Sequence, residues 1–335
     1  MNADTSSKKV RGLFAATLSI LLWGVTFVCT KSLLNDFSPM EILFFRFVIA
    51  YFSLWIIHPV RMKVPVKDNF LFAIAGLTGV TIYQFSENLA TVFTTASNVS
   101  IIVSICPIFT AIVAQAFLKE KHVTLKFVLG FIIAISGITL VSLNGLNTQN
   151  SGSFPKICLS NLKGDLLALL SAVSWGFYSL FVTLINRKKY DSLCSTRRIF
   201  FFAVIFMIPL IISGNIFSNP TGTERNLFYY AAVNWDAAVN KARFAKPLSW
   251  INLVFLGFFA SAVCFSLWCK ACNYLGTVKA TTGIYLIPVL KIVFEAIILG
   301  EKITPLQLLG AGLAIIGLFV STPKSEEKEL SKEAE

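Results

Sequence analysis

The sequence predicts an all-α polytopic membrane protein with ten transmembrane helices, arranged as two inverted five-helix repeats. Three observations lead to this prediction: the chain is strongly apolar, long apolar runs recur along its 335 residues, and its two halves share landmarks in one order. Of all residues 56% are hydrophobic and only 14% are charged, whereas about 25% are charged in typical soluble domains. This composition excludes an ordinary soluble domain.

Apolar runs of membrane-spanning length follow one another along the chain. A helix needs roughly 20 apolar residues to cross a hydrocarbon layer of ~30 Å. The uncharged runs are 12–30, 69–86, 88–118, 127–143, 166–186, 199–213, 247–269 and 303–323. Two more segments, 39–57 and 280–299, qualify if their ionisable residues are tolerated inside the membrane. Lipid offers no partner to open backbone groups, so all ten spans are expected to be helical.

Two stretches of the chain share one pattern, an apolar helix with a proline inside and a Glu-Lys pair at its end. The spacing from Pro107 to Glu120 equals the spacing from Pro288 to Glu301. Earlier landmarks recur at one common displacement: Gly12, Ser19, Trp23, Gly24 and Arg46 return as Gly164, Ser171, Trp175, Gly176 and Arg198. Self-similarity of this kind indicates a duplicated unit.

The number of crossings in each copy determines how the copies are oriented. Five is an odd number, so the second copy must enter the membrane from the opposite side. Inverted repeats with a binding site between them near the midplane are typical of secondary transporters. Most of the 29 Lys and Arg residues lie in loops on the amino-terminal side, and such loops are usually cytoplasmic. We therefore expect an integral protein of a bacterial-type inner or cell membrane with both termini cytoplasmic. The same location of the basic residues in loops explains the net charge of +12, so we expect no nucleic-acid partner.

These elements give the expected division of the chain. Residues 1–11 form a cytoplasmic amino terminus, 12–143 the first repeat, 144–163 an external linker, 164–322 the second repeat and 323–335 a cytoplasmic tail. The second repeat carries an insertion at about 214–248 that is too polar to span the membrane. We expect this insertion to be an external loop on the membrane surface, and the alternative is a lid over a ligand.

Together these features resemble the EamA-type, ten-helix members of the drug/metabolite transporter superfamily. The resemblance covers residues 12–322 and is carried by Trp-Gly in the first helix of each copy, Arg in the second, and Pro followed by Glu at the end of the fourth. It implies an exporter or exchanger of small metabolites such as amino acids, with a central cavity between the repeats. Two departures, Lys119 where the second copy has Gly300 and the long insertion, do not bear on the fold.

Ionisable residues inside the spans are candidates for substrate binding. Such groups are costly in a membrane and usually face a cavity or a partner. Glu87, Lys291 and Glu295 have no charged counterpart in the other copy, which favours ligand chemistry over a scaffold role. Lys291 and Glu295 are four residues apart on one helix face and can instead satisfy each other. Arg46 has a counterpart, Arg198, in the second copy, and we assign Arg46 a structural role.

Aromatic residues and prolines inside the spans complete the candidate set. The predicted substrate-binding aromatics are Trp23, Trp175, Tyr178, Trp268 and Tyr285. The first two lie about 16 Å into their helices at 1.5 Å per residue, too deep for an interfacial aromatic belt, and core packing is the alternative. Pro107 and Pro288 each remove a helix hydrogen bond and are expected to act as structural or hinge positions.

We therefore expect a secondary transporter that moves a small amphipathic organic metabolite, such as an amino acid, by alternating access, with export or exchange favoured. An uptake permease for a metabolite or cofactor, a channel and a membrane-embedded enzyme are the alternatives. The only two histidines, His58 and His122, lie in separate loops, and there is no GxxxxGK[ST] loop for nucleotide hydrolysis. We expect no enzyme activity, cofactor or metal, a proton or counter-substrate gradient as the energy source, and a monomer or homodimer.

Overall fold

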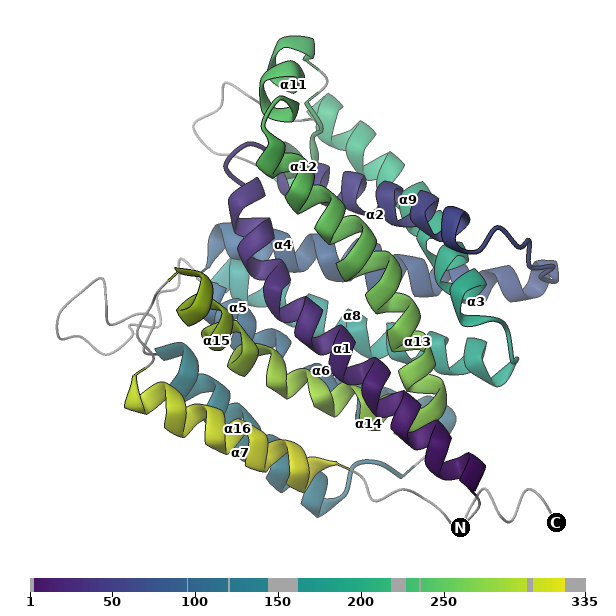
Figure 1. Ribbon diagram of the computed structural model, residues 1–335, viewed down its shortest axis with the longest axis vertical. Coiled ribbons are helices and arrows are strands. Elements are labelled where there is room, and N and C mark those ends of the chain that lie inside the picture. Colours follow the sequence, from purple (N-terminus) through teal and green to yellow (C-terminus); the bar gives the residue numbers. More distant parts are fainter. Residues whose placement is uncertain are drawn as a thin grey trace.

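The computed structural model describes residues 3–94, 96–119, 121–143, 162–217, 227–234, 236–299 and 304–322; within these ranges some side chains, including those of Lys291 and Glu295, are not described. All regular elements in these ranges are helices (Figure 1). The chain is an all-α polytopic membrane protein, as the sequence predicts. The predicted tail and all but the last two residues of the predicted linker lie outside the described residues.

The helices of the first half follow the predicted order. They are α1 (Ala3–Leu33), α2 (Pro39–Ile57), α3 (Val66–Gly76), the π-helical η1 (Leu77–Ile82), α4 (Tyr83–Phe93), α5 (Ala96–Val103), α6 (Cys106–Leu118) and α7 (Leu125–Leu143). The third crossing is therefore α3, η1 and α4 without a break, and the fourth is α5 followed by α6. Helix α1 begins at Ala3, so the predicted amino-terminal segment is largely its first turns.

The second half repeats this order. Its helices are α8 (Leu162–Arg187), α9 (Ser192–Phe217), α10 (Leu227–Ala231), α11 (Ala237–Phe244), α12 (Pro247–Val254), the π-helical η4 (Phe255–Val263), α13 (Cys264–Leu275), α14 (Thr277–Thr282), the 3-10 helix η5 (Gly283–Leu286), α15 (Ile287–Leu299) and α16 (Pro305–Ser321). Again the third crossing contains a π-helical segment and the fourth is broken. Helices α10 and α11 belong to the insertion.

Within the described residues, six helical segments are long and apolar enough to cross a membrane: Ser7–Thr26, Pro39–Ile57, Ile101–Leu118, Leu162–Arg187, Ser192–Phe217 and Pro247–Leu275. Three shorter apolar helices, Leu125–Leu140, Thr277–Leu290 and Pro305–Ser321, correspond to further predicted spans. The remaining predicted span is the unbroken helix from α3 to α4. The count of ten crossings stays a prediction for that segment and for the shorter helices.

The contacts between helices show that the two repeats are inverted. Gly12 at the start of α1 faces Leu275 at the end of α13. Thr183 near the end of α8 is hydrogen-bonded to Thr277, which lies at the same end of the bundle. Helix α1 therefore begins where its counterpart α8 ends.

Helices α7 and α16, the last of each repeat, lie side by side along one edge of the bundle (Figure 1). A Cβ atom on Gly137 would lie 2.5 Å from the backbone nitrogen of Ala314, and one on Gly317 would lie 2.3 Å from that of Ala134. These distances leave no space for a side chain. Gly137 and Gly317 therefore permit backbone contact between α7 and α16, as small residues do between membrane helices.

The prolines of the fourth crossings lie just after a break in the helix. Helix α5 ends at Val103, and α6 restarts with Pro107 in its first turn. In the other repeat, the 3-10 segment η5 precedes α15, which restarts with Pro288 as its second residue. The break thus precedes each proline, because proline is well accommodated in the first turn, where its missing N–H has no partner to lose.

The insertion is anchored at the end of the bundle opposite the start of α1 (Figure 1). Helix α9 continues to Phe217 and α12 begins at Pro247, so the irregular part is shorter than the 214–248 expected from the sequence. Helix α10 packs on α9, where a Cβ on Gly214 would meet the backbone of Ala231 at 2.5 Å. The hydroxyl of Ser38 donates to the carbonyl of Ala232 at 2.9 Å.

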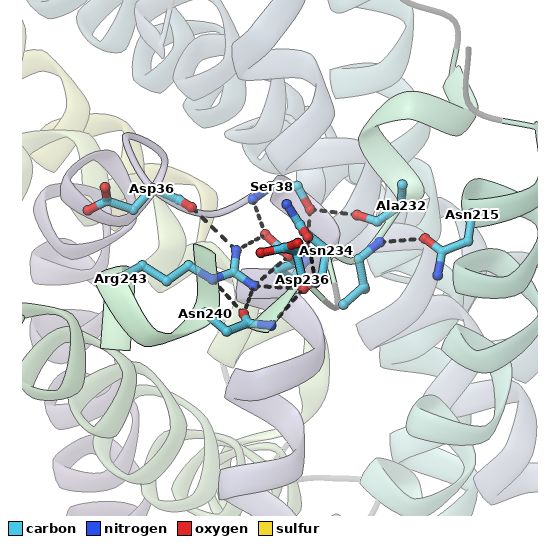
Figure 2. A network of polar contacts seen from close by, with 10 residues as sticks. Asp36, Ser38, Asn215, Ala232, Asn234, Asp236, Asn240 and Arg243 are labelled. Atoms are coloured by element: carbon cyan, nitrogen blue, oxygen red, sulfur yellow. Dashed lines mark hydrogen bonds and ion pairs between the residues drawn. The ribbon is translucent and has the colours of Figure 1, made fainter. Parts of the chain in front are cut away.

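A buried ion pair holds α11 against the start of α2. The guanidinium of Arg243 donates to both carboxylate oxygens of Glu41, each at 2.9 Å, and both side chains are at most 4% exposed. The same carboxylate accepts backbone N–H groups of Ser38 and Asn234, each at 2.7 Å. Figure 2 shows Arg243 beside Asn234 and Asn240, and Oδ1 of Asn240 also accepts from Arg243. The described part of the insertion is thus packed on the protein.

Candidate functional site

A group of aromatic side chains meets where α1, α8 and α13 cross, and we call it the central aromatic cluster. Its members are Trp23 of α1, Tyr83 of α4, Trp175 and Tyr178 of α8, and Phe265 and Trp268 of α13. The ring centroids of Trp23 lie 5.8 Å from those of Trp175 and 5.1 Å from those of Trp268. Trp23 and Trp175 are matching residues of the two repeats, so the cluster lies at the interface between them.

The three tryptophans of the cluster differ in their hydrogen bonds. The indole N–H of Trp23 donates to the carbonyl of Ala260, in η4, at 3.0 Å. Those of Trp175 and Trp268 are buried and have no acceptor among the described residues. An unsatisfied buried donor costs about 1–3 kcal/mol. These two donors are therefore available to a ligand that carries an acceptor.

Tyr178 owes its position to a glycine in the π-helical segment η1. The ring is fully buried, and a Cβ on Gly79 would lie only 2.1 Å from it. The hydroxyl lies beside the thiol of Cys269 but makes no hydrogen bond of good geometry. Gly79 is thus a site residue that could not be recognised from the sequence. The repeat comparison did not mark it, because the matching position in the other repeat is not a glycine.

Arg46 links three helical segments next to the cluster. Its Nε donates to the hydroxyl of Ser261 at 2.5 Å, and its Nη1 donates to Oε1 of Gln84 at 3.2 Å. The twin Arg198 instead donates to Asn69 Oδ1 at 2.8 Å. These contacts are consistent with the expected scaffold role, although the two arginines serve different partners.

Glu87 is connected to the cluster through one tyrosine. The hydroxyl of Tyr83 donates to Oε1 of Glu87 at 3.4 Å, and the Tyr83 ring lies 4.9 Å from that of Trp175. The positive charge of Arg46 also acts on the Glu87 carboxyl. Glu87 is partly exposed, so the structure brings one carboxyl, one buried cation and the aromatic rings into one region.

Besides Glu87, which adjoins the cluster, three predicted site residues are not placed in it. Tyr285 of η5 is fully buried with Ala134, Ile138 and Ala314, between α7 and α16. The side chains of Lys291 and Glu295 lie outside the described residues, although the backbone of α15 is described and packs on α1. Of the predicted substrate-binding aromatics, the structure therefore brings together Trp23, Trp175, Tyr178 and Trp268.

The rings of the cluster fill the space between α1, α8 and α13. Trp175, Tyr178 and Trp268 are each at most 2% exposed, so the rings would have to separate to admit a ligand. A groove of about 440 Å³ lies elsewhere, at the start of α1, and is lined by Val10, Arg11, Phe14, Ala15, Leu267, Lys270 and Tyr274. The described state is thus closed around the cluster.

Comparison with known proteins identifies the family. The model of the EamA-like transporter family matches residues 10–143 and 162–322. A probable amino-acid metabolite efflux pump of Escherichia coli is 26% identical over 312 residues, which cover 91% of this chain and 93% of that protein. A probable terminal-alkyne amino-acid exporter of Streptantibioticus cattleyicolor is 24% identical over 315 residues, covering 93% and 94%.

A solved crystal structure has the same fold. It superposes with a TM-score of 0.64 over 98% of this chain and 99% of that chain, at 17% sequence identity. At this identity the likeness shows the fold alone. The family match, by contrast, covers nearly the whole chain in two stretches. This chain therefore belongs to the EamA-like transporter family and is a membrane transporter.

Proposed function

We propose that this transporter moves a small amphipathic metabolite of the amino-acid class across the membrane by alternating access, as an exporter or exchanger. Support for the class and direction comes from relatives named an amino-acid exporter and an amino-acid metabolite efflux pump. Both termini are taken to be cytoplasmic, because Lys and Arg are concentrated in the loops on that side.

The observation that carries the proposal is the pair of unsatisfied indole donors inside the central aromatic cluster. A substrate carboxylate would accept from the N–H groups of Trp175 and Trp268, which have no acceptor among the described residues. An apolar side chain would pack on the rings, and a substrate ammonium would be attracted to the Glu87 carboxyl and to the aromatic faces. These are the three parts of an amphipathic amino acid.

The position of the cluster suits alternating access. Its matching residues Trp23 and Trp175 come from helices that run in opposite directions and meet at the interface between the two repeats. Inverted repeats in transporters expose such a midplane site first to one side and then to the other. The described closed arrangement corresponds to a state between these two.

Trp175→Phe and Trp268→Phe test the role of the indole donors. Each change removes an N–H group and keeps an aromatic ring, so the KM for a transported amino acid should rise about tenfold, the effect of one lost hydrogen bond of about 1.4 kcal/mol. Each variant loses ring volume, as Trp23→Phe does, but no hydrogen bond to a described residue, so its melting temperature should fall less than that of Trp23→Phe. Counterflow of a panel of labelled amino acids into liposomes measures transport, and thermal unfolding measures stability.

Trp23→Phe is the matched control, because it breaks the hydrogen bond to Ala260 and should lower the melting temperature. Unchanged KM values in both Trp175→Phe and Trp268→Phe, with counterflow intact, would assign these residues to packing. No saturable counterflow by the wild-type protein with any amino acid would instead reject the proposed substrate class.

Glu87→Gln tests whether this carboxyl carries protons. We expect loss of substrate-driven proton movement in liposomes, while exchange of labelled for unlabelled substrate continues, because glutamine keeps the hydrogen bond from Tyr83 and cannot titrate. Glu295→Gln, in the same assay, tests the other predicted carboxyl. Proton movement equal to wild type in both variants would leave a counter-substrate gradient as the energy source.

A further inference from the structure

The structure brings three metal-ligating side chains together at the end of the bundle where α1 begins. His58 directly follows α2, Asp191 directly precedes α9, and Cys194 lies in the first turn of α9. Their ligand atoms all lie within 4.8 Å of one another. None of the three contacts the central aromatic cluster through any bond described above, so this group is independent of the proposed substrate site.

The backbone around this group is held in place by other contacts. Arg197 donates to the carbonyl of His58 at 2.6 Å and to the carbonyl of Val60. Its guanidinium lies 3.7 Å above the ring of Trp55. The Asp191 carboxylate accepts the backbone N–H of Cys194 at 2.9 Å. The end of α2 and the start of α9 are therefore joined without any ion, which makes the site preorganised.

The distances suit a shared ion better than a direct bond. His58 Nε2 lies 3.7 Å from Asp191 Oδ1, too far for a hydrogen bond. Two ligands of a tetrahedral zinc ion, with bonds of about 2.0–2.1 Å, lie about 3.3–3.4 Å apart, so a small side-chain movement is sufficient. Nη2 of Arg197 lies 3.7 Å from the sulfur of Cys194, which also lies 3.6 Å from the carbonyl oxygen of Val60.

The ligand set also indicates which ion fits. An imidazole nitrogen, a carboxylate oxygen and a thiolate sulfur are the ligand types of zinc sites, and a thiolate selects against Mg²⁺ and Ca²⁺. Cys194 is buried, whereas the side chains of His58 and Asp191 are 34% and 50% exposed. Water can therefore reach a fourth coordination position from the open side.

We propose that His58, Asp191 and Cys194 form a binding site for Zn²⁺ or a divalent cation of the same class, with water as the fourth ligand. Helices α2 and α9 are the matching second helices of the two repeats. An ion bound here cross-links them at the end of the bundle that holds the start of α1.

Cobalt serves as the spectroscopic probe of this site in the purified, reduced full-length chain. Titration with Co²⁺ should give saturable binding of one ion per chain with a thiolate-to-cobalt charge-transfer absorption, and Zn²⁺ should displace it. The absorption should vanish in Cys194→Ser. The affinity should fall at least about tenfold in His58→Gln and Asp191→Asn. Asparagine still caps a helix, so the second of these variants keeps α9 intact.

Two controls keep the outcome specific. Cys272→Ser and His122→Gln change residues of the same types elsewhere and should bind Co²⁺ like the wild type. Zn²⁺, but not Mg²⁺, should raise the melting temperature of the wild-type protein, a measurement that needs no variant. Absence of saturable binding up to millimolar Co²⁺, or an absorption that survives in Cys194→Ser, would overturn the proposal.

Discussion

Arg243→Met is expected to lower the free energy of unfolding by about 3–5 kcal/mol, the usual cost of removing one partner of a buried ion pair. The Glu41 carboxylate is 3% exposed and receives two of its hydrogen bonds from Arg243. Without the guanidinium, this carboxylate keeps the N–H groups of Ser38 and Asn234 but loses its counter-charge. A negative charge then remains buried beside the start of α2.

A double variant distinguishes the effect of the buried charge from the effect of lost packing. Glu41→Gln combined with Arg243→Met removes both charges, so the double variant should be more stable than Arg243→Met alone. Methionine also keeps part of the packing of Arg243 on the ring of Phe37, above which the guanidinium lies at 4.5 Å. Unfolding is measured by heat or denaturant in one detergent, and hydrogen exchange over 227–244 reports release of the insertion.

A neighbouring ion pair is the matched control. Lys246 donates to both carboxylate oxygens of Asp36, at 2.7 and 2.8 Å, but its side chain is 56% exposed. Lys246→Ala should therefore cost less than about 1 kcal/mol. Equal losses in Arg243→Met and Lys246→Ala would mean that the Arg243 pair is solvated and does not anchor the insertion.

Gly317→Ala is expected to destabilise the contact between α7 and α16 by about 3 kcal/mol, the upper end of the usual cost of overpacking. The new Cβ would lie 2.3 Å from the backbone nitrogen of Ala134 and 2.6 Å from its Cα. Backbone atoms cannot rotate away as a flexible side chain can, so the two helices must separate along their length. The melting temperature in detergent should fall by many degrees.

Gly312→Ala in the same helix is the matched control. A Cβ on Gly312 has nothing within 4 Å, so this change should be neutral or stabilise the helix by up to about 1 kcal/mol. Gly137→Ala, on the facing helix, should behave like Gly317→Ala, because its Cβ would lie 2.5 Å from the carbonyl oxygen of Gly310. Similar melting temperatures for Gly317→Ala and Gly312→Ala would show that the helices do not pack as described.

The inverted architecture could be predicted because it depends on properties that are local or periodic. Span length follows from bilayer thickness, and the doubled landmarks Trp23 and Trp175 mark the repeat. Their depth in the helix argued against an interfacial aromatic belt, and in the structure the two rings contact each other. None of these inferences requires knowledge of which helix face meets which neighbour.

The composition of the site could not be predicted in the same way. A helix that is apolar all round carries no polar face to show which side is buried against protein. Tyr285 therefore seemed equivalent to Tyr178, yet it packs between α7 and α16. Likewise, the sequence did not indicate that Arg243 of the insertion binds Glu41, because the two residues are remote in the sequence. His58 and Cys194 are also remote in the sequence, so their proximity could not be predicted from the sequence.

The sequence by itself determined that this protein is a helical membrane protein built from two copies of one unit in opposite orientations. Apolar length and an odd number of helices per copy are sufficient for that conclusion. The tertiary structure alone decided that the indole donors of Trp175 and Trp268 have no acceptor in the part of the chain that is described, while that of Trp23 has one. The physical reason is that a hydrogen bond depends on positions within a few tenths of an ångström, and only packing of distant helices sets those positions.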